Sequence, residues 1–210
     1  MIGPFFVSFD GPKATGKSTV LEAVAAALKE DGRYRVVSLC EKELDPFRSE
    51  TLGLIKELTA RPSRDLESLV CERMAAGRSW ITKNIVREQA AGNVVLIDRW
   101  YPSDAAFRRI VPFADILAMN LDHQVQIPDL HVAIVTAPEI SWRRAEARAK
   151  GLSSVVINTK EDHVNCTEAF NLVVAQQNWF SCRNEGSVAE ATLQITTLIQ
   201  KRLQALGLPG

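Results

Sequence analysis

The chain has 210 residues, 46% of them hydrophobic, which is enough apolar material for a substantial core and argues against disorder. Its 25 lysines and arginines balance 25 aspartates and glutamates, so overall charge cannot hold nucleic acid or an anionic membrane surface. We expect no nucleic-acid partner and no membrane partner. Any anionic ligand must be bound by a local group of cations.

The four cysteines are widely spaced and contain no Cys-x-x-Cys pair, so we expect reduced, mostly packed thiols. No apolar run approaches the roughly 18 residues that cross a bilayer. The start of the chain, Met1 to Asp10, lacks the basic flank and cleavable apolar segment of a signal peptide. These features favour a cytoplasmic protein. The absence of repeats and linker-like stretches favours a single domain over residues 1–210.

Short apolar runs alternate with longer amphipathic segments, which is typical of β-α-β units around a parallel, buried sheet. The sequence therefore predicts an α/β fold in three layers, with a five-stranded, mostly parallel sheet and helices on both faces. The expected strands are Phe5 to Phe9, Tyr34 to Leu39, Val94 to Ile97, Leu130 to Val135 and Asn178 to Cys182.

Four helices are predicted from apolar spacing and from capping residues. The first covers Lys17 to Glu30, and a long one covers Asp65 to Ala91, with Arg78 on its apolar stripe. A third begins at Pro138 and ends before Gly151, and a fourth follows a Ser187 capping box and continues through Leu203. The segment from Gly151 to Glu161 is expected to be a mobile loop.

The sequence from Gly11 to Ser18, Gly-Pro-Lys-Ala-Thr-Gly-Lys-Ser, matches G-x-x-x-x-G-K-[ST] and lies between the first strand and the first helix. In such a loop, backbone N–H groups and the helix N-terminus bind phosphate oxygens. We expect Lys17 to bridge the terminal phosphates of ATP and the Ser18 hydroxyl to bind Mg²⁺. The expected ATP-binding residues here are Gly11, Pro12, Lys13, Ala14, Thr15, Gly16, Lys17, Ser18 and Thr19.

An acidic residue is expected near the metal at the end of another strand, and Asp98 follows the apolar strand Val94 to Ile97. Arg99 comes next, and its forked donors suit a phosphate at the carboxyl end of a strand. A GTPase is disfavoured because Asp98 does not open an Asp-x-x-Gly motif. We therefore predict that Ser18 and Asp98 hold Mg²⁺ and that Lys17, Asp98 and Arg99 are catalytic.

Three segments in this order resemble the thymidylate kinase family of nucleoside monophosphate kinases, and the similarity covers nearly the whole chain. Phe6 to Gly11 resembles the opening strand of that family. The segment Asp98 to Phe107, Asp-Arg-Trp-Tyr-Pro-Ser-Asp-Ala-Ala-Phe, resembles its D-R-Y-x-x-S-x-x-A-[FY] motif, and Pro128 to Leu130 resembles a Pro-Asp-Leu before its fourth strand. The resemblance implies a P-loop kinase fold with a short lid and phosphoryl transfer from ATP to a nucleoside monophosphate.

The resemblance also implies a role for individual residues. The acceptor would be bound by Arg48, Met74, Arg78, Arg99, Trp100, Ser103, Phe107 and Arg108. A lid at about residues 141–161 would bring Arg144 to ATP. Arg144 and Arg148 are four residues apart and would share one helical face. Of the lid arginines, Arg148 is preferred to Arg143 as the catalytic cation. A loop from Arg183 to Ser187 would touch the adenine. A homodimer is implied, with the helices after the second and third strands as candidates for the contact.

Several residues depart from the family pattern, and most of them lie on the acceptor side. Lys13 stands where the family has an acidic residue that meets the acceptor sugar, and Met74 replaces a phenylalanine that stacks on the base. Gly77 replaces an acidic or amide residue, Trp100 replaces a tyrosine, and Arg108 replaces a Gln or Thr. Our hypothesis is an acceptor that differs from plain thymidylate: a modified pyrimidine nucleotide, or one with extra negative charge near Lys13 and Arg108.

Two other functions stay open at this point. One is a kinase for an unphosphorylated nucleoside or another small metabolite, although Arg48 and Arg99 would then face no anion. The other is a non-catalytic, nucleotide-binding regulator, although Lys17, Ser18 and Asp98 are all present. Release of ADP that depends on an acceptor separates these three functions.

Overall fold

The computed structural model describes residues 3–148 and 156–207 of the chain. Its centre is a sheet of five parallel strands in the order β2-β3-β1-β4-β5. The strands are β1 (Phe5–Asp10), β2 (Val36–Cys40), β3 (Val94–Asp98), β4 (Leu130–Val135) and β5 (Phe180–Arg183). The first strand in the sequence is the central one, with Val7 opposite Leu96 on one side and Leu130 on the other.

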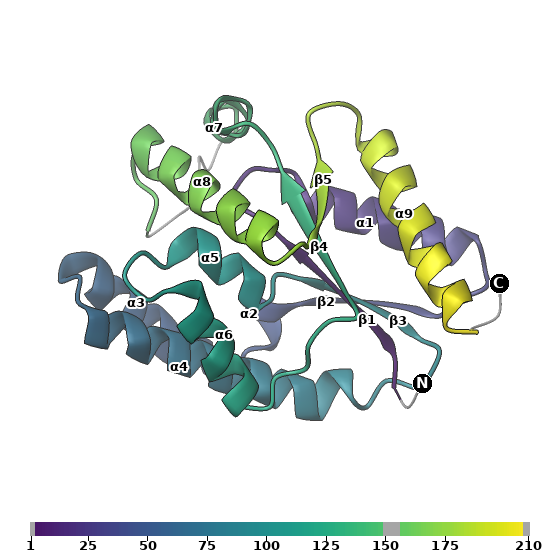
Figure 1. Ribbon diagram of the computed structural model, residues 1–210, viewed down its shortest axis with the longest axis horizontal. Helices are drawn as coiled ribbons and strands as arrows, with labels where there is room; N and C mark the ends of the chain where they lie inside the picture. Colours follow the sequence, from purple (N-terminus) through teal and green to yellow (C-terminus); the bar gives the residue numbers. More distant parts are fainter. Residues whose placement is uncertain (1–2, 149–155, 208–210) are drawn as a thin grey trace.

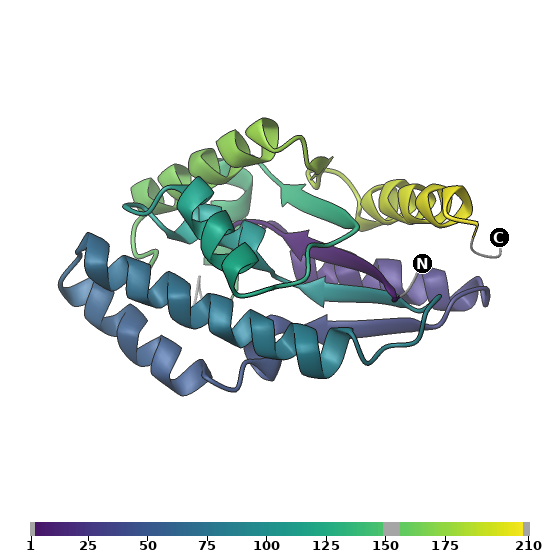
Figure 2. The ribbon, with the colours of Figure 1, turned by 60° about the horizontal axis from the view of Figure 1, so that its bottom comes forward.

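Helices cover both faces of this sheet, as Figures 1 and 2 show. The helices are α1 (Lys17–Glu30), α2 (Glu41–Leu44), α3 (Arg48–Ala60), α4 (Arg64–Ile81), α5 (Asp104–Phe107), α6 (Phe113–Asp122), α7 (Pro138–Glu146), α8 (Lys160–Gln176) and α9 (Val188–Ala205). A π-helical turn, Thr82–Val86, continues α4, and a 3-10 turn, Tyr101–Ser103, precedes α5.

The alternation of side chains along β1 shows how the two faces are built. Phe5, Val7 and Phe9 pack with α1 and α9 in one buried cluster. Phe6 points to the opposite face, where it packs with the π-helical turn after α4 and with the start of the segment after β3. Because both faces are covered, the strands are almost continuously apolar, as expected for a parallel sheet.

The predicted α/β fold and its five strands are confirmed, with strand boundaries that differ by up to two residues. The capping box that opens α9 is also confirmed: Ser187 accepts from the Glu190 N–H and Glu190 accepts from the Ser187 N–H. The helix predicted to reach Ala91 is α-helical only to Ile81. No Gly or Pro lies between Ile81 and Ala91, so the sequence contains no helix-breaking residue that would mark the end of the α-helix.

Among the described residues, five α-helices were not predicted: the short helices α2 and α5, and the longer helices α3, α6 and α8. The start of α8 corrects the expected loop from Gly151 to Glu161, because Lys160 and Glu161 already lie in the helix. Thr159 caps it through a capping box with Asp162. The helix predicted to run from Pro138 almost to Gly151 ends at Glu146. Residues 149–155, the middle of the expected lid, lie outside the described residues.

Candidate active site

A cavity of about 600 Å³ opens where β1, β2 and β3 end. Because parallel strands end at one edge of the sheet, the residues that follow them meet there. The cavity is lined by the phosphate loop from Pro12 to Thr19, by residues around α2 and α3, by Met74 of α4, and by residues 98, 99, 107 and 108. Arg148, beyond the end of α7, lies on its wall as well.

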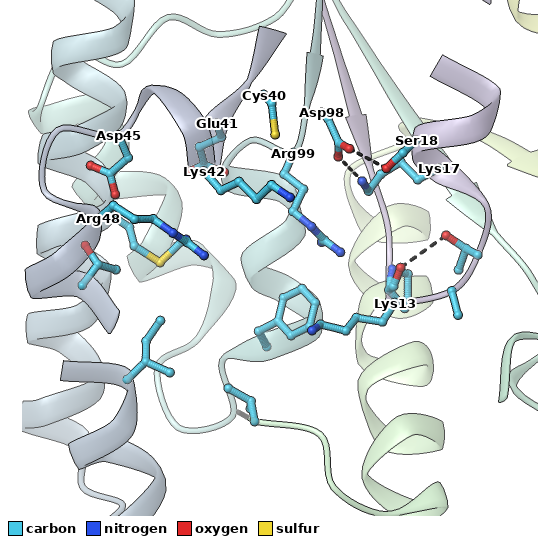
Figure 3. Close-up of a pocket in the computed structure, with 18 of the residues that line it drawn as sticks. Lys13, Lys17, Ser18, Cys40, Glu41, Lys42, Asp45, Arg48, Asp98 and Arg99 are labelled. Atoms are coloured by element: carbon cyan, nitrogen blue, oxygen red, sulfur yellow. Dashed lines mark hydrogen bonds and ion pairs between the residues drawn. The ribbon is translucent and has the colours of Figure 1, made fainter. Parts of the chain in front are cut away.

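At one end of the cavity, the phosphate loop meets the carboxylate of Asp98 (Figure 3). Lys17 forms an ion pair with Asp98 Oδ1, and Ser18 Oγ donates to Asp98 Oδ2 at 2.6 Å. Burial alone would raise the pKa of Asp98, but the charge of Lys17 and hydrogen bonds from Lys17 and Ser18 outweigh it and lower that pKa. Burial, and then the charge of Arg99, lower the pKa of Lys17 to about 8.

The far side of the phosphate loop is tied to the ends of β4 and β5. The carbonyl of Thr15 accepts from the Asn184 amide at 2.7 Å and from the Thr136 hydroxyl at 3.3 Å. Gly16 has a φ of +87°, and a Cβ at this position would collide with the Asn184 amide. Only glycine therefore suits this position, both for its backbone conformation and for the space around it.

Asp10 holds the turn that follows β3. Its Oδ1 accepts from the Trp100 N–H at 2.9 Å, the Ser103 N–H at 3.1 Å and the Ser103 hydroxyl at 2.6 Å. Burial raises the pKa of Asp10, although these hydrogen bonds lower it in part. Arg99, between Asp98 and this anchored turn, has a φ of +72° and donates to the Gly11 carbonyl at 2.9 Å. The left-handed backbone places the Arg99 side chain in the cavity beside the phosphate loop.

The middle of the cavity holds four cations from different elements: Lys13, Lys42, Arg48 and Arg99. Figure 3 shows Lys13 and Arg48 extending into the space from opposite walls, with Lys42 and Arg99 between them. Burial, followed by the charges of Arg99, Lys42 and Arg48, lowers the pKa of Lys13 to about 8. Like charges gathered in this way repel one another, and an anionic ligand relieves the repulsion.

The end of the cavity away from the phosphate loop is mostly apolar. Met74 and Phe107 lie on its wall, and the Arg99 guanidinium stacks on the Phe107 ring at 5.0 Å. Arg108 also lines this region, with Nη2 3.9 Å from the Met74 sulfur. Thr51, Leu52 and Ile55 of α3 line the cavity here as well, and Asp45 brings a carboxylate beside Arg48 (Figure 3).

Arg78, expected to face the acceptor base, is instead 1% exposed and absent from the cavity wall. Its Nε donates to Glu41 at 2.6 Å, and its Nη1 donates to Asp104 at 2.7 Å and to Asn120 at 3.3 Å. Burial alone would lower the pKa of Arg78, but Asp104 and Glu41 outweigh it. Burial raises the pKa of Glu41 despite the charge of Arg78.

Two further residues expected at the acceptor lie beneath the cavity wall. Trp100 is fully buried, packs edge-on against Phe6 at 5.5 Å, and donates its indole N–H to the Gln126 carbonyl. Ser103 is bound to Asp10. Gly77, which departs from the family pattern, lets the Asp45 carboxylate approach α4, since a Cβ would lie 2.5 Å from an Asp45 oxygen.

The arginines expected to close over ATP lie in different places. Arg144 donates to the Asn184 carbonyl at 2.9 Å and so supports the phosphate loop from behind. Arg148 lies two residues beyond α7 and lines the cavity, so the two do not share the face of one helix. Arg143 is exposed, and Arg183 at the end of β5 pairs with Glu185 at 3.6 Å.

The sequence analysis missed Lys42, Asp10 and Asn184. A signal existed for Lys42 and Asn184, because each follows a strand closely, at the edge where the site forms. Asp10 is the last residue of β1 and precedes the loop motif directly. A position at or just after the end of a strand does not distinguish a residue that binds a ligand from one that anchors a turn.

A family model described as thymidylate kinase matches residues 9–195. A thymidylate kinase from Caulobacter vibrioides is 32% identical over 152 residues, 69% of this chain and 70% of that protein. One from Caldicellulosiruptor saccharolyticus is 30% identical over 151 residues, 69% of this chain and 71% of that protein.

A crystal structure of thymidylate kinase from Ehrlichia chaffeensis superposes with a TM-score of 0.61 at 16% identity, covering 94% of this chain and 99% of that one. At that identity the structure supports the fold alone, whereas the match to the family model extends across the phosphate loop, Asp98 and Arg99. Within the described residues, no helix is both long and apolar enough to span a membrane. The chain belongs to the thymidylate kinase family, and it is a phosphotransferase of the nucleoside monophosphate kinase type.

Proposed function

We propose that this enzyme transfers the γ-phosphoryl group of ATP to a nucleoside monophosphate, most simply a pyrimidine deoxynucleotide or a modified relative. One observation carries the proposal: a single cavity joins the phosphate loop to a group of cations and then to an apolar end. These three parts match, in order, a triphosphate, an acceptor phosphate and an acceptor base. The thymidylate kinase names of the relatives support the same class of acceptor.

The reaction needs two polyanions to meet end to end, and the cations of the cavity meet this need. Lys17 and the loop amides neutralise the donor phosphates, while Arg48 and Arg99 hold the acceptor phosphate in line. An acceptor phosphate oxygen forms a bond to the γ-phosphorus as the bond to the β–γ bridging oxygen breaks, and ADP leaves with that electron pair. The acceptor is already ionised, so no strong general base is needed. Arg148 lines the same cavity, and its role would be to meet the charge that develops during transfer.

The oxygen atoms at the phosphate loop fit Mg²⁺. Ser18 Oγ and Asp98 Oδ2 are 2.6 Å apart and are the hard oxygen ligands that this ion prefers. Among the described residues, no group of three or more His, Cys, Asp or Glu could hold a metal ion. We therefore propose that Ser18 and Asp98 hold the ion together with water and phosphate oxygens. Its chemistry would be to neutralise charge on the β- and γ-phosphates.

The test is a screen of acceptors that measures ADP release, with and without chelation of magnesium. We expect release with nucleoside monophosphates, none with nucleosides, and loss of release in EDTA with recovery on adding Mg²⁺. Lys17→Ala should lower kcat by about 10²–10³-fold, because it removes a charge at the transferring phosphate. ATP binding without acceptor-dependent ADP would contradict the proposal and favour a regulator. Equal turnover of nucleosides would favour a metabolite kinase.

We also propose a homodimer formed through the helices after the second and third strands. Leu69 and Trp80 of α4 and Leu121 of α6 are exposed large apolar side chains in this region, which supports an association surface. Light scattering behind size exclusion should give twice the mass of the chain. A mass equal to one chain at micromolar concentration would contradict this assembly.

A further inference from the structure

The acceptor end of the cavity contains a different cation from the one the family pattern indicates. Arg78 is held by Glu41 and Asp104, two carboxylates for one guanidinium, and it does not line the cavity. Arg108 does line it, next to Met74. Of these two arginines, only Arg108 therefore lines this end of the cavity.

Arg108 is only 8% exposed, yet its charge is not balanced by a side chain in the part of the chain that the structure describes. Its Nε and Nη1 have no hydrogen-bond partner there, and its Nη2 meets only the Met74 sulfur, at 3.9 Å. Glu67 reaches the same turn, but its oxygens accept from the N–H groups of residues 109, 110 and 111 at 3.0, 2.6 and 2.6 Å. A buried cation without a counter-ion is costly, so a ligand anion at this position binds strongly.

We propose that Arg108 is the residue that selects the acceptor, and that the preferred acceptor is a pyrimidine nucleoside monophosphate with an anionic group, such as a carboxylate, on its base. The inference rests on the proposed function. The apolar side chains of Met74 and Phe107 suit the faces of a planar base, and Arg108 suits an anion at its edge. A neutral base oxygen forms a weaker hydrogen bond with guanidinium than a carboxylate does. Thymidylate is then a slower substrate.

The first experiment compares kcat/KM for thymidylate and for 5-carboxy-2′-deoxyuridine monophosphate at saturating Mg²⁺ and ATP. We expect the wild-type enzyme to prefer the carboxylated acceptor at least about tenfold, and Arg108→Gln to abolish this preference. Arg61→Gln is the matched control, because Arg61 is 80% exposed and lies outside the cavity. Equal kcat/KM for both acceptors in wild type, or an equal loss for both in Arg108→Gln, would overturn the proposal.

The second experiment measures thermal stability and separates recognition from a structural role. Arg108→Met replaces an unbalanced buried charge with an apolar side chain, so we expect a melting temperature equal to or above that of wild type. A merely structural Arg108 would give a lower melting temperature and no change in acceptor preference. The carboxylated acceptor should raise the melting temperature of wild type more than thymidylate does, and this difference should vanish in Arg108→Met.

Binding distinguishes failure of this inference from failure of the proposed function. Calorimetry with each acceptor and no ATP needs no phosphoryl transfer. If no nucleotide releases ADP but the carboxylated one still binds at least tenfold tighter through Arg108, the proposed function fails and the recognition stands. If thymidylate is turned over and both acceptors bind equally, the function stands and the recognition fails.

Discussion

Replacing Arg78 with methionine tests whether this side chain serves the fold or the ligand. The guanidinium is 1% exposed and bonds to Glu41 at 2.6 Å and Asp104 at 2.7 Å. Removing one partner of a buried pair costs about 3–5 kcal/mol, because a buried charge is left uncompensated. For a chain of 210 residues, about 2–4 °C per kcal/mol converts this loss to a melting temperature lower by about 6–20 °C.

The stability lost in Arg78→Met should also depend on pH, and the direction of this dependence follows from Glu41. Burial already raises the pKa of Glu41 in the folded state, and Arg78 is the charge that opposes this. Without Arg78 the folded-state pKa rises further above the unfolded value, so folding takes up a proton. The stability tied to that proton is present at low pH and is lost as pH rises through the folded pKa. The deficit of Arg78→Met relative to wild type should therefore shrink as pH falls from 8 toward 5.

Urea denaturation at a series of pH values measures both effects. The matched control on the same helix is Arg64→Met, because Arg64 is 65% exposed and its pair with Asp115 at 3.2 Å is worth no more than about 1 kcal/mol. A loss as small as that of the control, or a deficit that stays constant with pH, would refute the reasoning. An unchanged stability together with a large rise in the KM of the acceptor would also refute it, since that result would indicate that Arg78 binds the acceptor base.

Two further predictions concern the phosphate loop. Gly16→Ala should weaken ATP binding about tenfold or more, measured by calorimetry, because φ is +87° and the added Cβ displaces Asn184. The control is Gly32→Ala, which has a φ of +73° and open space around it and should leave ATP affinity unchanged. Equal effects of the two substitutions on ATP affinity would contradict this account. Lys13 and Lys17 both have a pKa of about 8 in the ligand-free enzyme, so kcat/KM for ATP should fall above pH 8 with a logarithmic slope that approaches two. In Lys13→Arg that slope should approach one, and an unchanged profile would show that Lys13 does not act on ATP.

The sequence predicted the strands and the phosphate loop because these depend on local patterns. An apolar run, a glycine-rich bend and the start of a helix follow one another within a few residues, and the conformation of each depends on residues close to it in the sequence. The contact of Lys17 with Asp98 spans 81 positions, yet it follows from the same rule, since parallel strands end at a common edge.

Residues whose role depends on tertiary packing were not predictable in this way. Periodicity correctly placed Arg78 on the buried stripe of α4, but it could not show that two carboxylates, from α2 and α5, would bind it there. Helix α8 is another case, because its apolar residues form a weak stripe. Its capping box was visible as Thr159 and Asp162, although aspartate stands where glutamate or glutamine is usual.

The position of β1 at the centre of the sheet has a consequence for synthesis of the chain. β1 precedes the other four strands in the sequence, but its two neighbours begin at Val94 and Leu130, so its edges can be paired only after these distant segments have been made. Its sequence, Phe-Phe-Val-Ser-Phe-Asp, is apolar and suited to strands. Until both of these strands have been made, the growing chain exposes an apolar segment of the kind that chaperones for short hydrophobic stretches bind.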